Sequence, residues 1–564
     1  MTRKFKNEKR DIILIIISGI LIHLTMLFVS GAWWDDWKFY VNDYFDVAMR
    51  THYISAGRLD AYYIIGLVNQ LPVCLFRLVV IICFTLSAVF IYKMLLNLFN
   101  DRHQAFIISI LYNAIPVNDV RLMKCVFPYT FALCFFWLGT LLLTYTFKTQ
   151  KKRNKYILRI FTLILYFVAF STSSLLVYYI IPLAIIWFIE AYELIKEKNL
   201  HFRTYLKRVL KYLDFYILPI LFWSVKNIFF SASGLYKSYN SVSVGRSLSA
   251  ITLTGKTAVY SGAHILFSWF SVIKENLFII VCFAVIVFAC FLLRDSFAKE
   301  MKHIPKRYQL LGIIIGGVIY LLGLFPYVVV RQGVLSTTGL EGRDSLLACL
   351  GICIMVYYFM NLLSIPNWGQ YALAICIMFA SFLHFHGWYM TYLKDYYDQV
   401  ALQQNWRNTN EVKDGKTFIY IRENNSRLNA DRFYSLCALS KQVYGDTSRF
   451  FSCGINDLKY ITDSTNQVLY LYVEDTTSSM DQYDMSNIKI DGIMIADYNL
   501  TIEDCYKLKF EELFRHDDFL NDVEGYIEYS YIPIDAETSE QILKMYEDGI
   551  LTSNDELIEI CSLH

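Results

Sequence analysis

The hydrophobic and polar positions divide the chain into two parts. From Ile12 to about Trp388 long apolar stretches recur, each close to the ~20 residues that a helix needs to cross a bilayer. From about Tyr397 onward the apolar runs are short and polar residues separate them, as in a water-soluble domain. The pattern predicts a polytopic α-helical membrane protein that carries a carboxyl-terminal soluble domain.

The apolar stretches predict about eleven membrane-spanning helices. Their expected positions are 12–30, 73–99, 104–118, 127–147, 156–172, 174–192, 213–230, 276–293, 308–330, 345–363 and 367–388. The segment 31–72 is aromatic and only partly polar, which predicts amphipathic helices in the membrane interface.

Basic residues cluster in four places, and the loops between these places lack such clusters. The clusters occupy 1–10, 148–155, 196–211 and 294–307. Because loops rich in lysine and arginine stay in the cytoplasm, the amino terminus is expected there. Eleven spans then place segment 31–72 and the carboxyl-terminal domain on the outside, so that domain is expected to be extracytoplasmic.

Charge indicates a domain boundary near the same point. Residues 395–564 contain 32 acidic and 14 basic residues, whereas residues 1–394 contain 18 acidic and 38 basic ones. We therefore expect a membrane domain over 1–394 and an acidic domain over 395–564. In the acidic domain, buried strands are expected at 417–422, 468–473 and 490–496, and helices at 429–444 and 539–551. This alternation predicts a small α/β fold.

The run Trp33-Trp34-Asp35-Asp36-Trp37 directly follows the first apolar stretch. Carboxylates are costly near hydrocarbon and are usually kept there for chemistry or transport. Trp33, Trp34 and Trp37 are expected to lie in the headgroup layer and to fix the depth of the two carboxylates. Asp35 and Asp36 are therefore candidates for a general base that takes the proton of an acceptor hydroxyl. The alternative is an aromatic belt with two solvated acids.

Asp119 is the only acid of the second expected outer loop, in Pro116-Val-Asn-Asp-Val-Arg121. It is a candidate for orienting a substrate, and the alternative is a local ion pair with Arg121. One acidic pair supplies too few ligands to require a divalent cation, although such a cofactor stays possible.

Among the basic residues expected outside or within a span, four are candidates for binding a substrate. They are Arg58, Lys226, Arg331 and Arg343. Such cations suit a phosphate ester, because arginine offers a planar fork of hydrogen-bond donors. The alternatives are a local pair between Arg343 and Asp344 and a Lys226 side chain that reaches toward the interface.

Several motifs are absent from the sequence. It contains no Walker A run, which disfavours ATP-driven transport, and neither His-Glu-x-x-His nor Gly-x-Ser-x-Gly. The topology accounts for the basic clusters, so no nucleic-acid partner is expected.

An acidic pair just after the first span resembles the GT-C superfamily of polytopic glycosyltransferases. Residues 10–390 are also similar to the bacterial membrane glucosyltransferase group, whose first loop carries Asp-Asp-Trp and then Gly-Arg. Here these motifs are Asp35-Asp36-Trp37 and Gly57-Arg58. Phe325-Pro326-Tyr327, followed by an arginine near the next span, is a similar arrangement. The chain departs from the group at Leu59 and Asp344, where an aromatic residue and a histidine are common.

The resemblance implies a hexosyltransferase of the bacterial cell membrane with a GT-C-like bundle. Such an enzyme takes a sugar from a polyprenyl-phosphate donor and transfers it, with inversion, to a surface glycan or other acceptor on the non-cytoplasmic face. It implies Asp35 or Asp36 as the base, with Asp119 assisting. The leaving phosphate would be held by Arg331 and Arg343, with Arg58 and Lys226 behind them.

Three other functions stay open at this point. A lipid-linked glycan flippase or transporter usually has polar residues in the middle of several helices and repeated halves, whereas these spans are nearly free of acids. A multispan glycan polymerase relies on a large arginine-rich outer loop. A scaffold that displays the acidic domain leaves the Trp33–Trp37 run without a role.

Overall fold

The computed structural model describes residues 2–37, 47–198, 201–233, 237, 244–275, 278–294, 304–424, 428, 431–445, 449–458 and 489–562. The chain divides into two compact units. Unit 1 contains Met1–Phe28 and Ile54–Gly387, and unit 2 contains Val29–Tyr53 and Trp388–His564. The sequence predicts one boundary at 394/395. The division into units passes from Gly387 to Trp388 inside helix α18 (Asn367–Asn408), the same helix that contains 394/395, and it also assigns Val29–Tyr53 to unit 2.

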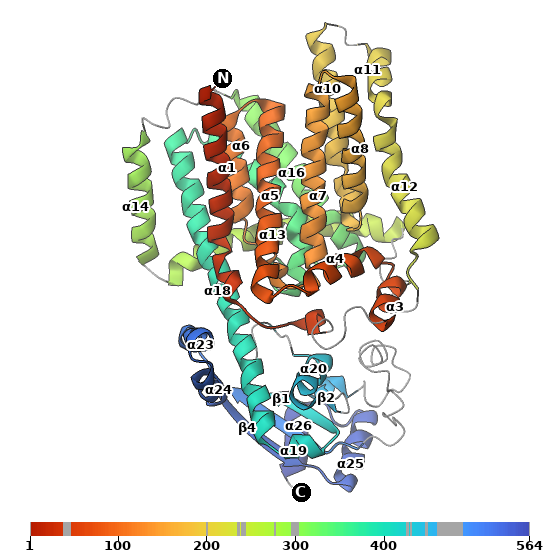
Figure 1. Cartoon of the computed structure of the whole chain (residues 1–564), viewed down its shortest axis with the longest axis vertical. Helices are drawn as coiled ribbons and strands as arrows, with labels where there is room; N and C mark the ends of the chain where they lie inside the picture. The colour runs from red at the N-terminus through yellow and green to blue at the C-terminus, as the bar shows by residue number, and fades with distance from the viewer. Residues whose placement is uncertain are drawn as a thin grey trace. The chain divides into compact units, whose positions relative to one another are not determined.

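Most described elements before residue 409 are helices (Figure 1). The α-helices are α1 (Thr2–Ile22), α3 (Val47–Ser55), α4 (Leu59–Asn69), α5 (Val73–Phe99), α6 (Arg102–Ala114), α7 (Phe127–Lys148), α8 (Lys152–Ala169), α9 (Ser174–Tyr178), α10 (Ile180–Lys196), α11 (Phe202–Val209), α12 (Leu213–Phe229), α13 (Val244–Glu275), α14 (Phe278–Leu292), α16 (Lys306–Arg331), α17 (Cys349–Leu362) and α18. The 3₁₀-helices are η1 (Leu24–Phe28), η2 (Trp34–Asp36), η3 (Asp119–Leu122), η4 (Leu210–Tyr212) and η7 (Leu340–Ala348). In unit 1, α1, α5 and α7 run side by side.

Six segments of the described chain are long and apolar enough to cross a membrane, which makes this a helical membrane protein. They are Val73–Phe99, Phe127–Lys148, Ser174–Lys196, Lys306–Arg331, Leu340–Leu362 and Asn367–Asn408. The eleven expected spans are not confirmed. Each overlaps a helix, but α6, α12 and α14 have only 13, 17 and 15 residues. Helices α1 and α8 begin with strongly basic turns.

Helices α16 and α17 pack closely because glycines face their contact. A Cβ on Gly351 would lie 2.4 Å from the backbone nitrogen of Tyr320, and one on Gly323 would lie 2.6 Å from the Leu347 carbonyl. Small residues allow this close approach between apolar helices. The packing fixes the end of α16 at Arg331 against η7, which contains Arg343.

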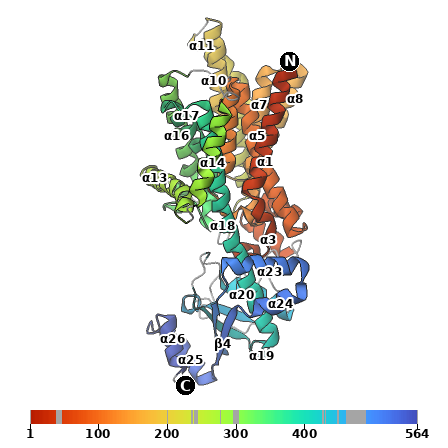
Figure 2. The same ribbon diagram turned by 90° about the vertical axis from the view of Figure 1, so that its left-hand side faces the viewer.

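Helix α13 occupies most of segment 231–275, which lies between the expected spans 213–230 and 276–293 and is expected from the sequence to be a loop on the outside. Figure 2 shows α13 lying across the direction of α16 and α17. The Tyr320 hydroxyl of α16 donates to the carbonyl of Ala258 in α13 at 2.9 Å. Helices α3 and α4 fall within segment 31–72, where the sequence predicts helices.

Unit 2 contains a four-stranded mixed sheet in the order β2-β1-β3-β4. The strands are β1 (Thr417–Arg422), β2 (Phe450–Cys453), β3 (Gly492–Tyr498) and β4 (Ile527–Pro533). β1 pairs in parallel with β2 and β3, and β4 pairs antiparallel to β3. Two expected strands are thus confirmed as β1 and β3, whereas the one at 468–473 lies outside the described residues.

Helices pack on this sheet through a buried core that includes Ile419, Phe433, Ile493, Ile542 and Leu557. The remaining elements are α19 (Glu411–Asp414), α20 (Phe433–Tyr444), η8 (Ile455–Asp457), α23 (Ile502–Phe514), α24 (His516–Glu524), α25 (Ala536–Glu547) and α26 (Asn554–Ser562). The helices expected at 429–444 and 539–551 correspond to α20 and α25, and the α/β character of this region is confirmed.

Candidate functional site

All four cations expected from the sequence line one cavity of unit 1, with a volume of about 330 Å³. Arg58 precedes α4, Lys226 lies on α12, Arg331 ends α16 and Arg343 lies in η7. We call this space the basic cavity. Its residues come from segments far apart in the sequence, so only the fold brings them together.

Local structure aims these side chains into the basic cavity. The hydroxyl of Ser173 accepts a hydrogen bond of 2.7 Å from the Lys226 ammonium. Ser174 donates to the Tyr327 hydroxyl at 2.8 Å, which ties the first residue of α9 to the last turns of α16. In the sequence, Ser171–Ser174 is a short run of hydroxyl residues between two apolar stretches. Such a run indicates a polar surface at this point, and three of its residues line the basic cavity.

One carboxylate, Asp344, also lines the basic cavity and is buried. It pairs with the Nε of Arg331, and its Oδ1 lies 3.8 Å from the Nε of Arg343. The local pair expected as the alternative for Arg343 is therefore present. Arg331 also donates to Glu341 at 2.5 Å, outside the lining. Because four cations face one lining carboxylate, the cavity suits an anionic group.

An apolar cavity, also of about 330 Å³, adjoins the basic one. Lys226 lines both, and the walls of the apolar cavity include Leu59, Phe167, Phe222 and Phe230. A ligand that fills both spaces has an anionic group at one end and a hydrocarbon portion at the other.

Gly57 joins the walls of the two cavities, just before Arg58. Its φ of +65° is a conformation that glycine adopts readily. A Cβ at this position would lie 2.7 Å from the Phe230 carbonyl. The Ser233 amide donates to the Ser55 carbonyl at 2.8 Å, which holds the two segments together. Close backbone packing therefore favours glycine at position 57, whereas Arg58 contributes its side chain to the wall of the basic cavity.

Asp119 is buried in unit 1, where its carboxylate accepts the Gly339 amide at 3.1 Å. The neighbouring Asn118 amide donates to the Thr337 carbonyl at 3.3 Å. These contacts hold the backbone of the segment that leads into η7 and Arg343. Arg121 donates to the carbonyls of Asn118 and Val117 at 2.8 and 2.5 Å.

Asp35 and Asp36 lie in unit 2, within the 3₁₀ turn η2. Asp36 is buried, whereas Asp35 is partly exposed. All three tryptophans of the run are also buried. The Trp33 indole donates to Asp395 at 2.9 Å, and its ring meets Tyr392 edge-on. The expectation that Trp33 lies among lipid headgroups is therefore wrong, because protein groups surround it.

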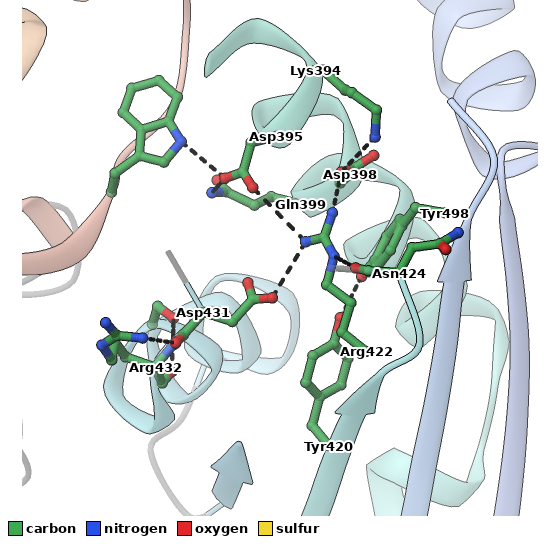
Figure 3. A network of polar contacts seen from close by, with 12 residues as sticks. Lys394, Asp395, Asp398, Gln399, Tyr420, Arg422, Asn424, Asp431, Arg432 and Tyr498 are labelled. Atoms are coloured by element: carbon green, nitrogen blue, oxygen red, sulfur yellow. Dashed lines mark hydrogen bonds and ion pairs between the residues drawn. The ribbon is translucent and has the colours of Figure 1, made fainter. Parts of the chain in front are cut away.

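A buried polar network supports this loop, and sequence reasoning missed it. The Gln399 amide donates to the Ala32 carbonyl at 3.2 Å and to Asp395 at 3.1 Å. Figure 3 shows the Arg422 guanidinium among three carboxylates. Its distances to Asp395, Asp398 and Asp431 are 3.8, 2.5 and 3.3 Å. The sequence offers one signal for this network: Asp398 and Gln399 follow Asp395 by three and four residues, the spacing at which side chains meet on one helix face.

The network keeps Arg422 charged at the end of β1. Burial by itself disfavours the charged form, but the neighbouring carboxylates of Asp431 and Asp398 raise the pKa of Arg422 above its ordinary value. The guanidinium also lies over the Tyr498 ring, 4.3 Å from its centroid. Helix α18, the sheet and the Trp33 loop are thereby joined inside unit 2.

The described residues contain no group of three or more histidine, cysteine, aspartate and glutamate side chains arranged to hold a metal ion. Comparison with models of known protein families and with curated proteins finds no match to the chain. The features of the described chain that bear on function are therefore the two cavities of unit 1 and the Asp35-Asp36 loop of unit 2.

Proposed function

We propose that the protein transfers a sugar from a polyprenyl-phosphate donor to a surface glycan or similar acceptor. One observation supports this most: the basic cavity and the apolar cavity share Lys226. A polyprenyl phosphate has the matching chemistry, since a charged phosphate ester is attached directly to a long hydrocarbon chain. The resemblance of the Asp35-Asp36 and Gly57-Arg58 motifs to the bacterial membrane glucosyltransferase group suggests the non-cytoplasmic face of a bacterial cell membrane as the place of the reaction.

In the proposed reaction, an aspartate takes the proton of the acceptor hydroxyl. The hydroxyl oxygen attacks the anomeric carbon, and the bond between that carbon and the phosphate oxygen breaks. The electron pair leaves with the lipid phosphate. Because the hydroxyl attacks from the face opposite this leaving group, the configuration at the anomeric carbon inverts. Cations that meet the developing negative charge lower the barrier, and one such donor typically changes a rate by about 10²–10³.

The roles follow from burial and contacts. Asp35 is our choice for the base, because a partly exposed carboxylate is accessible to an acceptor whereas Asp36 is buried. Arg343 and Arg331, which Asp344 orients, are assigned to the phosphate together with Lys226 and Arg58. Asp119 is assigned to positioning, since its carboxylate holds the backbone before Arg343.

The test measures sugar transfer in membranes supplied with a labelled polyprenyl-phosphate sugar. Asp35→Asn keeps the size of the side chain but removes the base, so transfer is expected to fall by about 10²–10⁴. The matched control is Asp555→Asn, at an exposed position on α26. Equal transfer by the parent and Asp35→Asn, with both folded, would reject Asp35 as the base.

A second candidate, a flippase for lipid-linked sugars, fits the same pair of cavities because it binds the same lipid phosphate. The products distinguish the two functions. Transfer creates a new glycosidic bond on the acceptor, whereas a flippase leaves the sugar attached to its lipid and moves it between leaflets.

A further inference from the structure

One helix of unit 2 exposes an unusual number of apolar side chains. Five residues of α23 have exposed fractions between 42% and 71%. They are Ile502, Tyr506, Phe510, Leu513 and Phe514. Ile502, Tyr506 and Phe510 follow one another at intervals of four residues. Leu513 and Phe514 come three and four residues after Phe510, so all five lie on one face of the helix. Cys505 and Leu508 are buried on the opposite side, so α23 packs on unit 2 and still presents an apolar stripe.

Elsewhere in the described part of unit 2, large apolar side chains are mostly covered. Among the described residues after Trp388, Ile550 is the one other large hydrophobic side chain that is exposed. Single exposed apolar residues are common on soluble surfaces, but a continuous stripe usually marks a binding surface. The stripe includes the packed rings of Phe510 and Phe514, whose centroids are 5.0 Å apart.

The attachment of α23 suggests what covers the stripe. Glu512 accepts hydrogen bonds from the hydroxyls of Tyr397 at 2.9 Å and Tyr396 at 3.5 Å, both on α18. The apolar stretch of that helix ends near Trp388 in the sequence. At a rise of 1.5 Å per residue, Tyr396 lies about 12 Å further along α18. Because the headgroup layer adds roughly 5–8 Å to each side of the hydrocarbon core, Tyr396 lies about 4–7 Å beyond that layer, so α23 is attached within reach of the membrane surface.

We propose that α23 is an interfacial helix, and that its apolar face inserts into the bilayer that holds the membrane-spanning helices of the same chain. Because α18 connects α23 to the membrane-spanning helices, α23 meets the lipid surface at a high effective concentration. Aromatic side chains such as Tyr506 and Phe510 suit the boundary between headgroups and acyl chains.

Charge determines which lipids the helix prefers. Helix α23 carries four acidic residues, Glu503, Asp504, Glu511 and Glu512, against two lysines, Lys507 and Lys509. A helix of this composition gains nothing from anionic headgroups, so apolar burial drives its insertion. Binding is therefore expected in zwitterionic bilayers and is expected to change little with salt.

The experiment uses the full chain in phosphatidylcholine vesicles with benzoylphenylalanine in place of Phe514. This probe sits on an exposed position, so the packed face of α23 is left unchanged. The matched control carries the same probe in place of Ile550, which is exposed but lies outside the stripe. After illumination, mass spectrometry identifies what each probe has attached to.

The proposal predicts a lipid adduct at position 514 and none at position 550, with the same yield in low and high salt. The double substitution Tyr506→Gln and Phe510→Gln is expected to remove the adduct at 514. An adduct with a second copy of the chain, an adduct with another protein, or no lipid adduct would each overturn the proposal. None of these outcomes depends on sugar transfer.

Discussion

Replacing Arg422 by methionine removes the charge at the centre of the unit 2 network. Methionine keeps an unbranched apolar stem beside Tyr498 but loses every ionic and hydrogen-bonding group. Asp398, which is buried, would keep the Lys394 ammonium at 3.3 Å as a donor. Asp395 would keep the Trp33 indole and the Gln399 amide.

The expected cost follows from leaving buried carboxylates without their cation. Removing one partner of a buried ion pair typically costs about 3–5 kcal/mol, because the other charge is then uncompensated. Asp431 adds little, since its side chain is 26% exposed and water can solvate it. At 1.4 kcal/mol per factor of ten, this cost means roughly a hundred- to a few thousand-fold more opening of unit 2.

Hydrogen exchange of the β1 and β3 amides in the full chain measures that opening directly. Arg422→Met is expected to speed exchange by the factor above. Arg407→Met, at an exposed position on α18, is the matched control and is expected to stay within about 0.5 kcal/mol of the parent. Adding Asp398→Asn to Arg422→Met should recover part of the loss. Equal exchange by the two arginine variants would refute the view that this network stabilises unit 2.

Two further predictions concern Gly57 and the first turn of α23. Gly57→Ala is expected to reduce sugar transfer, because the added Cβ would clash with the Phe230 carbonyl. The matched control is Gly549→Ala, which has a similar φ of +68° and no atom within 4 Å of the added Cβ, and it should leave transfer unchanged. Hydrogen bonds from the Thr501 hydroxyl and backbone amide hold the pKa of Asp504 below its ordinary value of 3.8. The ionised Asp504 carboxylate therefore stabilises the fold above that pH. This stabilisation is lost as the pH falls through the pKa of Asp504 in the folded state. Thr501→Val should therefore cost about 1 kcal/mol at pH 7 and less at low pH in thermal unfolding, and an equal cost at both would contradict this.

The helices and two strands could be predicted from periodicity, since apolar stretches and buried β-runs are local signals. The number of spans could not, because α6 and α14 are apolar but short. Helix α13 was missed because its apolar residues alternate with small and polar ones, as in Ser247–Thr257. The strand β4 was missed because its pattern is half exposed.

The cations of the basic cavity were identifiable because charged residues are rare near apolar segments. Their shared cavity and the hydrogen bond from Lys226 to Ser173 were not, because both depend on tertiary packing. The hydrogen bond from Trp33 to Asp395 could not be predicted from the sequence either, since these residues are 362 positions apart.

The proposed function requires that the basic and apolar cavities together hold a polyprenyl phosphate, and photolabelling of the protein by such a lipid measures this binding. A photoreactive polyprenyl phosphate is added to membranes that contain the parent, Lys226→Met or Lys256→Met, the last being a matched change at an exposed site on α13. The account predicts labelled peptides from α12 and α4 in the parent and in Lys256→Met, and roughly tenfold or greater loss of label in Lys226→Met. Equal labelling of all three proteins, or label confined to other segments, would contradict it.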